Sequence, residues 1–406
     1  MAGKVATLPA GRRLTDYIGV GLLTKAVPLE EVVDVLEKTG RNSRRQRELP
    51  AQIIVYYVIA LALYMQVSYR EVMRCLLEGL QCLFGPKFEI KVVSKSSISE
   101  ARTKLGYEPI KLLHDKLVKP VASKATRGAF YRIWQVVSLD GSTFDVADTK
   151  ENEIAFGKPA ANKGVSAYPQ IRFVSLVETG THVLFASHMG GCRKASEQAL
   201  ARTVVKNLSR GMLCIADRLF YGFKLWQTAK NTGADLLWRV KDGLQLSREK
   251  ELPDGSYLSR IYNPRKDRHK KNGTVVRVIE FTITKENGGE ENYRLITTIL
   301  DHEQAPALEL AALYQERWEI ETALDEVKTH LRGATITLRS KTPNLVRQEF
   351  YGFMLAHYAI RGLMHEAALK VDVDPDRLSY THSKRVILRK LPQFAAFPPG
   401  ALAMSS

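Results

Sequence analysis

The hydrophobic residues in the first third of the chain recur with the period of an α-helix. Between residues 28 and 38 apolar side chains stand three or four positions apart and Gly40 follows, which predicts an amphipathic helix that ends there. Pro50 begins a second segment, whose apolar run at 53–65 is 13 residues long, short of the roughly 20 that cross a bilayer. We therefore expect a buried helix within a helical N-terminal domain over residues 1–128.

Two capping boxes predict further helix starts in this domain. Ser68 with Glu71, and Ser97 with Glu100, each place a hydroxyl residue three positions before a glutamate, which satisfies the first amides of a helix. The second start lies in a basic, hydroxyl-rich stretch at residues 91–104. It either grips a phosphate as part of a helix-turn-helix or is a solvated helix start, and both interpretations stay open.

From about residue 130 the pattern changes to strands that alternate with helices. Short apolar and β-branched runs predict the strands, and helical periods predict the helices between them. In chain order these segments are strands 134–139, 171–177 and 182–186, helix 195–208, strand 212–216, helix 220–229 and strand 234–240. This order is that of a ribonuclease-H-like α/β core, an analogy of fold that by itself says nothing about function.

Residues 241–290 interrupt this core. Alternating β-branched and aromatic residues with a charged loop predict an inserted β-subdomain. A strand at 293–300 and a long helix at 306–331 resume the core, so we expect the catalytic domain to cover residues 129–334. The remainder, 335–406, is predicted to be a helical, basic C-terminal region.

The composition indicates the class of partner. Lys and Arg number 60 against 43 Asp and Glu, a net charge of +17, whereas 45% apolar and 25% charged residues are ordinary for a globular protein. This charge fits nucleic acid, an anionic membrane surface or another polyanion, and a membrane is disfavoured because no amphipathic anchor or lipidation signal occurs. With no apolar segment at its start, the protein is expected in the cytoplasm. The candidate DNA-binding side chains are Arg44, Arg45, Lys95, Arg102, Arg218, Lys270 and Lys271.

Carboxylates are the candidate metal ligands, since the four cysteines and nine histidines show no ligand spacing. Two predicted strands are followed by an aspartate, Asp140 and Asp217, and Glu321 lies in the long helix. Facing one another, these acids would form an oxygen-lined site suited to Mg²⁺ or Mn²⁺, and two such ions about 4 Å apart promote attack on a phosphodiester. The competing ligands are Asp145, Asp148 and Asp325.

The long helix carries further polar residues on one side. At about 100° per residue, Tyr314, Arg317, Glu321 and Lys328 fall within an arc of about 60°, directly beside an apolar face. By spacing alone, a solvated face with an Arg317–Glu321 ion pair is the more frequent explanation. The two aspartates that follow strands favour a site instead.

The Y-x2-R-x3-E-x6-K spacing that begins at Tyr314 resembles the signature of bacterial insertion-sequence transposases of family four, the group that includes the transposon-five transposase. The residues around Asp140 and Asp217 resemble that family's first and second catalytic blocks, and the N-terminal helical region resembles its N-terminal domain. The resemblance implies a DDE-type DNA transposase in which Asp140, Asp217 and Glu321 hold Mg²⁺ or Mn²⁺, as two ions. It also implies that Tyr314, Arg317 and Lys328 contact DNA phosphates.

The partners that the resemblance implies are the transposon's terminal inverted repeats, target DNA and a second copy of the chain in a synaptic complex. It implies no membrane, and it places the protein at the bacterial nucleoid. Two alternatives remain open. One is a catalytically inactive, domesticated DNA-binding protein, and the other is a ribonuclease-H-like nuclease without strand transfer.

Members of this family often cut through a DNA hairpin, with a flipped base stacked on a tryptophan. The corresponding position lies near Tyr293 or Arg294, where no tryptophan occurs. Trp238 and Trp318 are the nearest tryptophans. The residue that would stack a base is therefore open.

Overall fold

The chain forms two compact units that interleave along the sequence. The computed structural model describes residues 23–42, 49–65, 67–84, 93–161, 164–263, 271–284, 289–316, 323–331 and 337–384. Unit 1 combines residues 1–121, 145–155 and 325–406, and unit 2 combines residues 122–144 and 156–324. These units differ from the predicted succession of three consecutive segments, because helices from both ends of the chain pack together in unit 1.

Unit 1 is helical. Its elements are α2 (Leu29–Lys38), α3 (Ala51–Leu63), α4 (Tyr69–Phe84), α5 (Lys95–Leu105), α6 (Glu108–Leu117), most of α7 (Lys150–Phe156), η3 (Glu326–Leu331), α12 (Pro343–Lys370) and η4 (Pro375–Arg377). The predicted helices at 28–38 and 53–65 are thus confirmed as α2 and α3.

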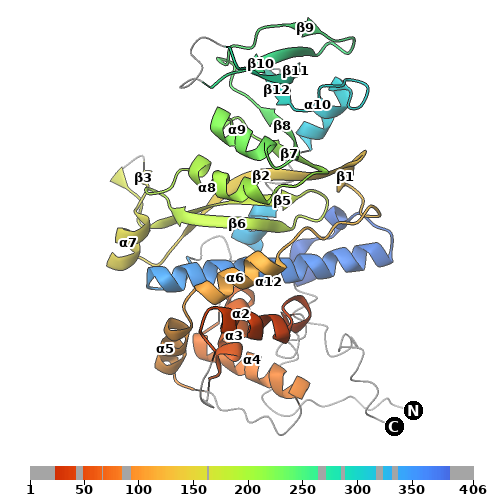
Figure 1. Cartoon of the computed structure of the whole chain (residues 1–406). Helices are drawn as coiled ribbons and strands as arrows, with labels where there is room; N and C mark the ends of the chain where they lie inside the picture. Colours follow the sequence, from red (N-terminus) through yellow and green to blue (C-terminus); the bar gives the residue numbers. More distant parts are fainter. Residues whose placement is uncertain are drawn as a thin grey trace, which may run out of the picture. The chain divides into compact units, whose positions relative to one another are not determined.

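Helix α3 is buried almost throughout, as its apolar run predicts. A helix that is apolar on all sides needs partners all round, and α2, α4, α5 and α12 supply them (Figure 1). The backbones of α12 and α3 approach closely at Gly352 of α12, where an added Cβ would lie 2.9 Å from the carbonyl oxygen of Val58. Burial of α3 therefore explains why a C-terminal helix belongs to the same unit as the N-terminal ones.

The helix caps in unit 1 agree with the sequence in one case and differ in the other. The Glu71 amide donates to the Ser68 hydroxyl at 3.2 Å at the start of α4, as predicted. Helix α5 begins earlier than predicted, because Ser94 is its N-cap and accepts from the Ser97 amide at 3.2 Å. The prediction of Ser97 as the cap was wrong, since a second serine three residues before it takes that position.

Unit 2 is built on one mixed sheet. Its ten described strands run in the order β6-β5-β2-β7-β8-β12-β11-β10-β9, with β1 beside β2. The strands are β1 (Phe130–Tyr131), β2 (Trp134–Asp145), β5 (Gln170–Glu178), β6 (Leu184–Gly191), β7 (Met212–Ala216), β8 (Asp235–Arg239), β9 (Lys250–Glu251), β10 (Tyr257–Ile261), β11 (Thr274–Thr284) and β12 (Glu290–Thr297). Strands β3 (Ala160–Ala161) and β4 (Gly164–Val165) form a separate pair.

The helices of unit 2 are α8 (Glu197–Val204), η2 (Val205–Asn207), α9 (Phe223–Lys230) and α10 (Ala307–Gln315). The predicted succession of three strands, helix, strand, helix and strand is confirmed by β2, β5, β6, α8, β7, α9 and β8. The central strands β2, β7 and β8 are parallel, whereas β5 and β6 are antiparallel to each other. Unit 2 therefore has an α/β core with a mixed sheet.

The strands expected in a separate inserted subdomain instead continue this sheet. Strand β12 pairs antiparallel with β8, placing Leu295 opposite Arg239, and β11, β10 and β9 follow outward. The open edge of β8 provides free backbone groups for this pairing. Residues 241–290 thus extend the core sheet rather than fold apart from it.

Helices cover both faces of the sheet. On one face α8 and α9 lie side by side (Figure 1), and Trp226 of α9 meets Trp238 of β8 edge to face at 5.3 Å between ring centroids. On the other face α10 packs over alternate residues of the central strands, including Val136, Leu213 and Leu237. Only side chains that point to this second face can therefore contact α10.

The helix predicted at 306–331 is confirmed in its first part. Pro306 is the N-cap of α10, which ends at Gln315 in unit 2. The described residues resume at 323, and Glu326–Leu331 form a π-helix, η3, in unit 1. No described helix is both long and apolar enough to cross a membrane.

Candidate active site

Asp140 and Asp217 follow directly opposed residues of neighbouring strands. The parallel pairing of β2 with β7 ends with Leu139 opposite Ala216, and each aspartate is the next residue along its strand. Adjacent strands lie about 4.8 Å apart, so the two backbones leave this pair side by side at one edge. The fold thus brings these two predicted residues together.

The strands that lead to both aspartates present the same face to α10. Successive side chains of a strand point to opposite faces. Asp140 is four positions after Val136, and Asp217 four positions after Leu213, and both of these residues lie in the core beneath α10. By this alternation Asp140 faces the side of the sheet that α10 covers, and Asp217 directly follows β7, whose Leu213 and Ile215 face that side.

The sequence predicted that strand β2 ends before Asp140, but the strand runs to Asp145. Gly141 allows this, because an added Cβ would lie 3.0 Å from the carbonyl oxygen of Phe173 and 3.3 Å from Cγ2 of Val174, both in β5. A glycine inside a strand marks such a close backbone approach. Gly141 therefore lets β2 continue beside β5.

The backbone next to each aspartate orients its side chain. The Gly141 amide donates to Oδ1 of Asp140 at 2.7 Å, and the Arg218 amide donates to Oδ1 of Asp217 at 2.6 Å. Both carboxylates are half-buried. The two sites therefore repeat one local geometry, in which the following amide fixes one oxygen of the carboxylate.

The loop after Asp217 is held by the first turn of α8. The Gln198 side chain donates to the carbonyl oxygens of Leu219 and Tyr221 at 3.3 and 3.4 Å. Burial raises the pKa of the Tyr221 phenol to about 12, so this side chain stays neutral at physiological pH. Sequence reasoning missed Gln198, because only the tertiary fold brings residues 198 and 219 together.

Tyr314 is a residue of α10 and belongs to the core between this helix and the sheet. Its side chain is 3% exposed, and its ring meets that of Tyr293 edge to face at 6.2 Å. The sequence had placed this phenol beside DNA phosphates, but burial keeps it from the surface. Tyr314 instead packs α10 against the sheet. The buried face of α10 is wider than the apolar face expected from the sequence, because Leu310 and Ala311 are buried as well.

Tyr293 offers no free ring face for a base. The Phe281 ring stacks on it at 5.2 Å from the β11 side, and the Arg239 guanidinium lies 3.8 Å from its centroid, from β8 on the opposite side. Trp238 is fully buried. Of the residues considered for base stacking, Trp318 lies outside the described residues.

The basic candidates fall into different environments. Arg218 and Lys271 are exposed in unit 2, and Lys95 is exposed at the start of α5. Arg102 is 1% exposed, and its guanidinium donates to Gln348 and Ser340 at 2.9 Å each. The suggestion that Arg102 binds DNA is therefore corrected, since its charge is enclosed within unit 1.

Several predicted residues lie outside the described part of the chain. They are the proposed third acid, one of its cationic neighbours and three of the basic candidates: Glu321, Arg317, Arg44, Arg45 and Lys270. Lys328 is half-buried in η3 of unit 1. Of the competing acids, Asp325 accepts a hydrogen bond from the Thr329 hydroxyl, and Asp145 and Asp148 belong to unit 1.

The donor set fits a hard divalent cation in part. Asp140 and Asp217, which follow paired residues of neighbouring strands, carry carboxylate oxygens, the ligands that Mg²⁺ and Mn²⁺ prefer. Within the described residues, no group of three or more His, Cys, Asp or Glu side chains could hold a metal ion. The assignment of Asp140, Asp217 and Glu321 as metal ligands therefore stays a prediction, and Glu321 lies outside the described residues.

Family models match most of the chain. The model "Transposase DDE domain" matches residues 135–358, and "Insertion element 4 transposase N-terminal" matches residues 17–115. The chain belongs to the insertion-element-4 family of DDE transposases. The family assignment made from the Tyr314 signature and the two aspartate blocks is thereby confirmed.

Two relatives from Escherichia coli strain K12 resemble this transposase. The transposase InsG for insertion sequence element IS4 is 26% identical, over 96% of this chain and 85% of its own length. The putative transposase InsZ is 22% identical, over 53% of this chain and 70% of its own length. A cryo-EM structure of the piggyBac transposase synaptic complex with hairpin DNA has 10% identity and a TM-score of 0.46, over 92% of this chain and 79% of that chain, too low to establish a shared fold.

Proposed function

We propose that this transposase binds the terminal inverted repeats of an insertion sequence, cleaves phosphodiester bonds in a metal-dependent reaction and joins the 3′-ends to target DNA by cut and paste. The observation that carries the proposal is the placement of Asp140 and Asp217 directly after paired residues of neighbouring parallel strands. The name of the InsG relative, a transposase for an insertion sequence element, supports it over 96% of the chain. We assign the sheet to the ribonuclease-H-like type.

Asp140, Asp217 and Glu321 would together hold two Mg²⁺ or Mn²⁺ ions. When bound, such ions activate a water or a 3′-hydroxyl and stabilise the leaving oxygen. The chain itself orients the carboxylates, through the Gly141 and Arg218 amides and through the fixed spacing of β2 and β7. Two of the acids therefore need little rearrangement to bind metal.

Cationic side chains would hold the DNA backbone. Arg218 is exposed directly beside Asp217, where its guanidinium can form a fork with a phosphate. Arg317 and Lys328 take the same role by the family signature, while Tyr314 acts by packing. Lys95 and Lys271 extend the contact surface, with residues 1–128 as the DNA-binding domain. A homodimer would bring two transposon ends together.

A cleavage assay tests the proposal. Purified protein is incubated with Mg²⁺ and a labelled duplex made from the DNA directly outside the reading frame, in parallel with Asp217→Ala. We expect cutting by the wild type and none by Asp217→Ala. The matched control is Asp242→Ala, which removes an exposed carboxylate of the same unit and should cut normally.

The other outcomes identify the alternatives. A wild-type protein that binds this duplex but leaves it uncut would be the domesticated DNA-binding protein. Cutting without any joining of 3′-ends to a target plasmid would indicate a nuclease. Equal cutting by wild type and Asp217→Ala would remove the catalytic assignment.

A second pair of variants separates binding from chemistry. Lys328→Ala should weaken binding of the end and lower the salt slope by about 0.9, as expected for one lost phosphate contact on duplex DNA. Glu321→Gln should leave binding intact and abolish cleavage. The assigned roles are wrong if Glu321→Gln loses binding while its residual cleavage falls only in proportion.

A further inference from the structure

The chain makes a tight turn directly after β7. The Phe220 amide donates to the carbonyl oxygen of Asp217 at 3.0 Å, so residues 217–220 form a β-turn with Arg218 and Leu219 at its two central positions. The Arg218 amide also donates to Oδ1 of Asp217 at 2.6 Å. The tip of this turn is therefore formed by the two residues that follow a proposed metal ligand.

The side chains of the turn differ in burial. Leu219 is 58% exposed and Arg218 is exposed as well, whereas the next residue, Phe220, is 3% exposed. Phe220 thus fixes the turn to the core of unit 2, while the two side chains at the tip extend into solvent. Single exposed leucines are common on protein surfaces, so exposure alone does not indicate a function for Leu219.

Helix α8 holds the backbone of the turn. Nε2 of Gln198 donates to the carbonyl oxygens of Leu219 and Tyr221, at 3.3 and 3.4 Å. Gln198 lies in the first turn of α8, whose N-cap Ser196 accepts a hydrogen bond from the Ala199 amide at 3.2 Å. The backbone at Leu219 is therefore fixed by a capped helix, although its side chain is in solvent.

The chemistry of the two tip residues suits a DNA strand and its bases. A guanidinium binds a phosphate through parallel hydrogen bonds, whereas a leucine side chain is stabilised by leaving water. Behind the phosphates of a duplex, the apolar surfaces are the faces of stacked bases, and leucine is among the residues that insert between base steps and unstack them. A fixed backbone favours this insertion, because less conformational freedom is lost on binding.

We propose that Leu219 inserts between the base pairs next to the phosphodiester that is cut, while Arg218 binds an adjoining phosphate, so that the duplex is opened beside Asp217. The inference rests on the proposed function, because it needs DNA to be cleaved near Asp217. Leu219 is a substrate-binding residue in this proposal and takes no part in bond breaking. Gln198 is a positioning residue, which acts by holding the turn.

The opposite edge of the sheet provides a matched control. Strand β12 runs antiparallel to β8 and so ends where β8 begins, and the Thr298 hydroxyl donates to Asp235, the first residue of β8, at 2.8 Å. Asp217 follows β7, which is parallel to β8 and ends at the other edge. The start of α10, a few residues after Thr298, therefore lies away from the turn at Asp217.

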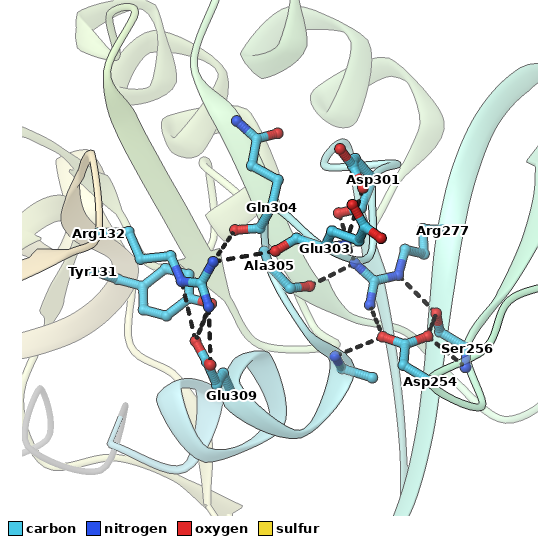
Figure 2. A network of polar contacts seen from close by, with 11 residues as sticks. Tyr131, Arg132, Asp254, Ser256, Arg277, Asp301, Glu303, Gln304, Ala305 and Glu309 are labelled. Atoms are coloured by element: carbon cyan, nitrogen blue, oxygen red, sulfur yellow. Dashed lines mark hydrogen bonds and ion pairs between the residues drawn. The ribbon is translucent and has the colours of Figure 1, made fainter.

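Figure 2 shows how the start of α10 is held. Arg277 of β11 donates to the carbonyl oxygen of Ala305 at 2.7 Å, and Oδ2 of Asp254 accepts from the Ala307 amide at 2.8 Å. The next residue, Leu308, is 83% exposed. Leu308 is thus also an exposed leucine on a fixed backbone, and its replacement by serine removes the same side chain from a different place.

The test compares Leu219→Ser, Leu219→Met and Leu308→Ser with the wild type on two labelled duplexes made from the flanking DNA. One duplex is fully paired, and the other is mismatched at the outer end of the inverted repeat, where the cut is expected. Cleavage of both duplexes is measured in Mg²⁺. Opening of the paired duplex is measured without divalent metal, from a fluorescent adenine analogue at the same end, whose emission rises when it is unstacked.

We expect Leu219→Ser to cleave the paired duplex ~10-fold more slowly than the wild type, because the burial of one leucine no longer offsets the unstacking of the bases. It should cleave the mismatched duplex within about twofold of the wild-type rate, since a mismatched base is the least costly to unstack. The emission should rise with the wild type and not with Leu219→Ser. Leu219→Met, which keeps an apolar chain, should retain most of the rate, and Leu308→Ser should match the wild type.

Other results overturn the proposal. Equal cleavage of the paired duplex by Leu219→Ser and the wild type, or an unchanged rise in emission, would show that Leu219 does not open the bases. An equal loss on both duplexes would indicate a disturbed turn instead of a lost insertion. A loss that accompanies a change from dimer to monomer in sedimentation would place Leu219 in contact with a second copy of the chain.

Failure of the proposed function gives a different result. A wild-type protein that binds both duplexes and leaves both uncut would overturn the proposed function itself. The emission experiment needs binding and no cleavage, so its outcome for Leu219→Ser still decides whether this side chain opens the duplex.

Discussion

The helices of unit 1 and one edge of the sheet in unit 2 use charged residues in opposite ways. In unit 1, Arg102 and Arg361 are buried among helices, where Arg361 donates to Glu326 at 2.8 Å and Arg102 donates to side chains of α12 and the segment before it. In unit 2, Asp140 and Asp217 stay half-buried at a sheet edge, and the cation next to Asp217 is exposed. The two buried arginines of unit 1 link helices to one another, whereas the two aspartates of unit 2 are accessible to ligands.

The difference shows that the number of charged residues does not locate function. Arg102 lies in a basic stretch, yet its guanidinium is enclosed, because a buried guanidinium requires several acceptors and α12 supplies them. The aspartates belong to the less numerous acidic residues, yet the edge of a parallel sheet leaves them accessible. Burial, rather than sign, separates the two uses.

The largest expected effect concerns the accessible acids of unit 2. Asp140→Asn should lower the rate of DNA cleavage by ~10³-fold or more, as seen when a central catalytic group is removed. The fold should persist, because the amide oxygen still accepts from the Gly141 amide. Cleavage rates and circular dichroism check this. Substantial cutting by Asp140→Asn would contradict the role of the accessible acids of unit 2 in cleavage.

The next largest effect concerns the enclosed charges of unit 1. Arg361→Met should lower the free energy of unfolding by about 3–5 kcal/mol, because it leaves the Glu326 carboxylate buried without its main partner. The double variant Arg361→Met/Glu326→Gln should recover part of that loss. Denaturant titrations measure the free energy of unfolding of both variants. Equal stability of the single variant and wild type would show that this ion pair does not stabilise the fold.

A smaller effect should sharpen the link between sheet packing and the acids. Gly141→Ala should cost about 1–3 kcal/mol, because the new methyl group meets the Phe173 carbonyl oxygen and β2 must shift from β5. Cleavage should fall with it, since Asp140 moves with the strand. Gly243→Ala, whose added Cβ meets nothing within 4 Å, is the matched control. Equal unfolding midpoints for the two variants would contradict the close approach.

The smallest effect distinguishes two neighbouring serines in unit 1. Ser94→Ala should lower the free energy of unfolding by about 1 kcal/mol through loss of the α5 cap, while Ser97→Ala should cost less. Thermal unfolding of the two variants gives the ranking. The reverse ranking would restore the cap that the sequence alone predicted.

The predictable parts of the fold are those that local pattern decides. The buried helix α3 and the strand-helix succession of unit 2 followed from hydrophobic period and length. The extent of β2 did not, because Gly141 serves a contact with β5 rather than a turn. The continuation of the sheet from β12 into β11, β10 and β9 could not be predicted, since edge-to-edge pairing leaves no mark in one strand's own sequence.

The candidate site divides in the same way. The residue types and spacing identified Asp140, Asp217 and the family, because chemistry demands those side chains in that order. The burial of Tyr314 and Arg102 was hidden, as a helical wheel gives a direction but not the partner that covers it. Gln198, Arg277 and Asp254 were missed for a related reason, because each acts on a segment more than 20 residues away in the chain.

The sequence by itself thus determined the succession of elements, the candidate acids and the family, since these depend on local period and on side-chain chemistry. Only the tertiary structure decided which charges remain accessible, where the strands at 250–284 join the sheet and what holds the start of α10. The physical reason is that burial and pairing are properties of two surfaces in contact, and each segment of sequence describes only one of them.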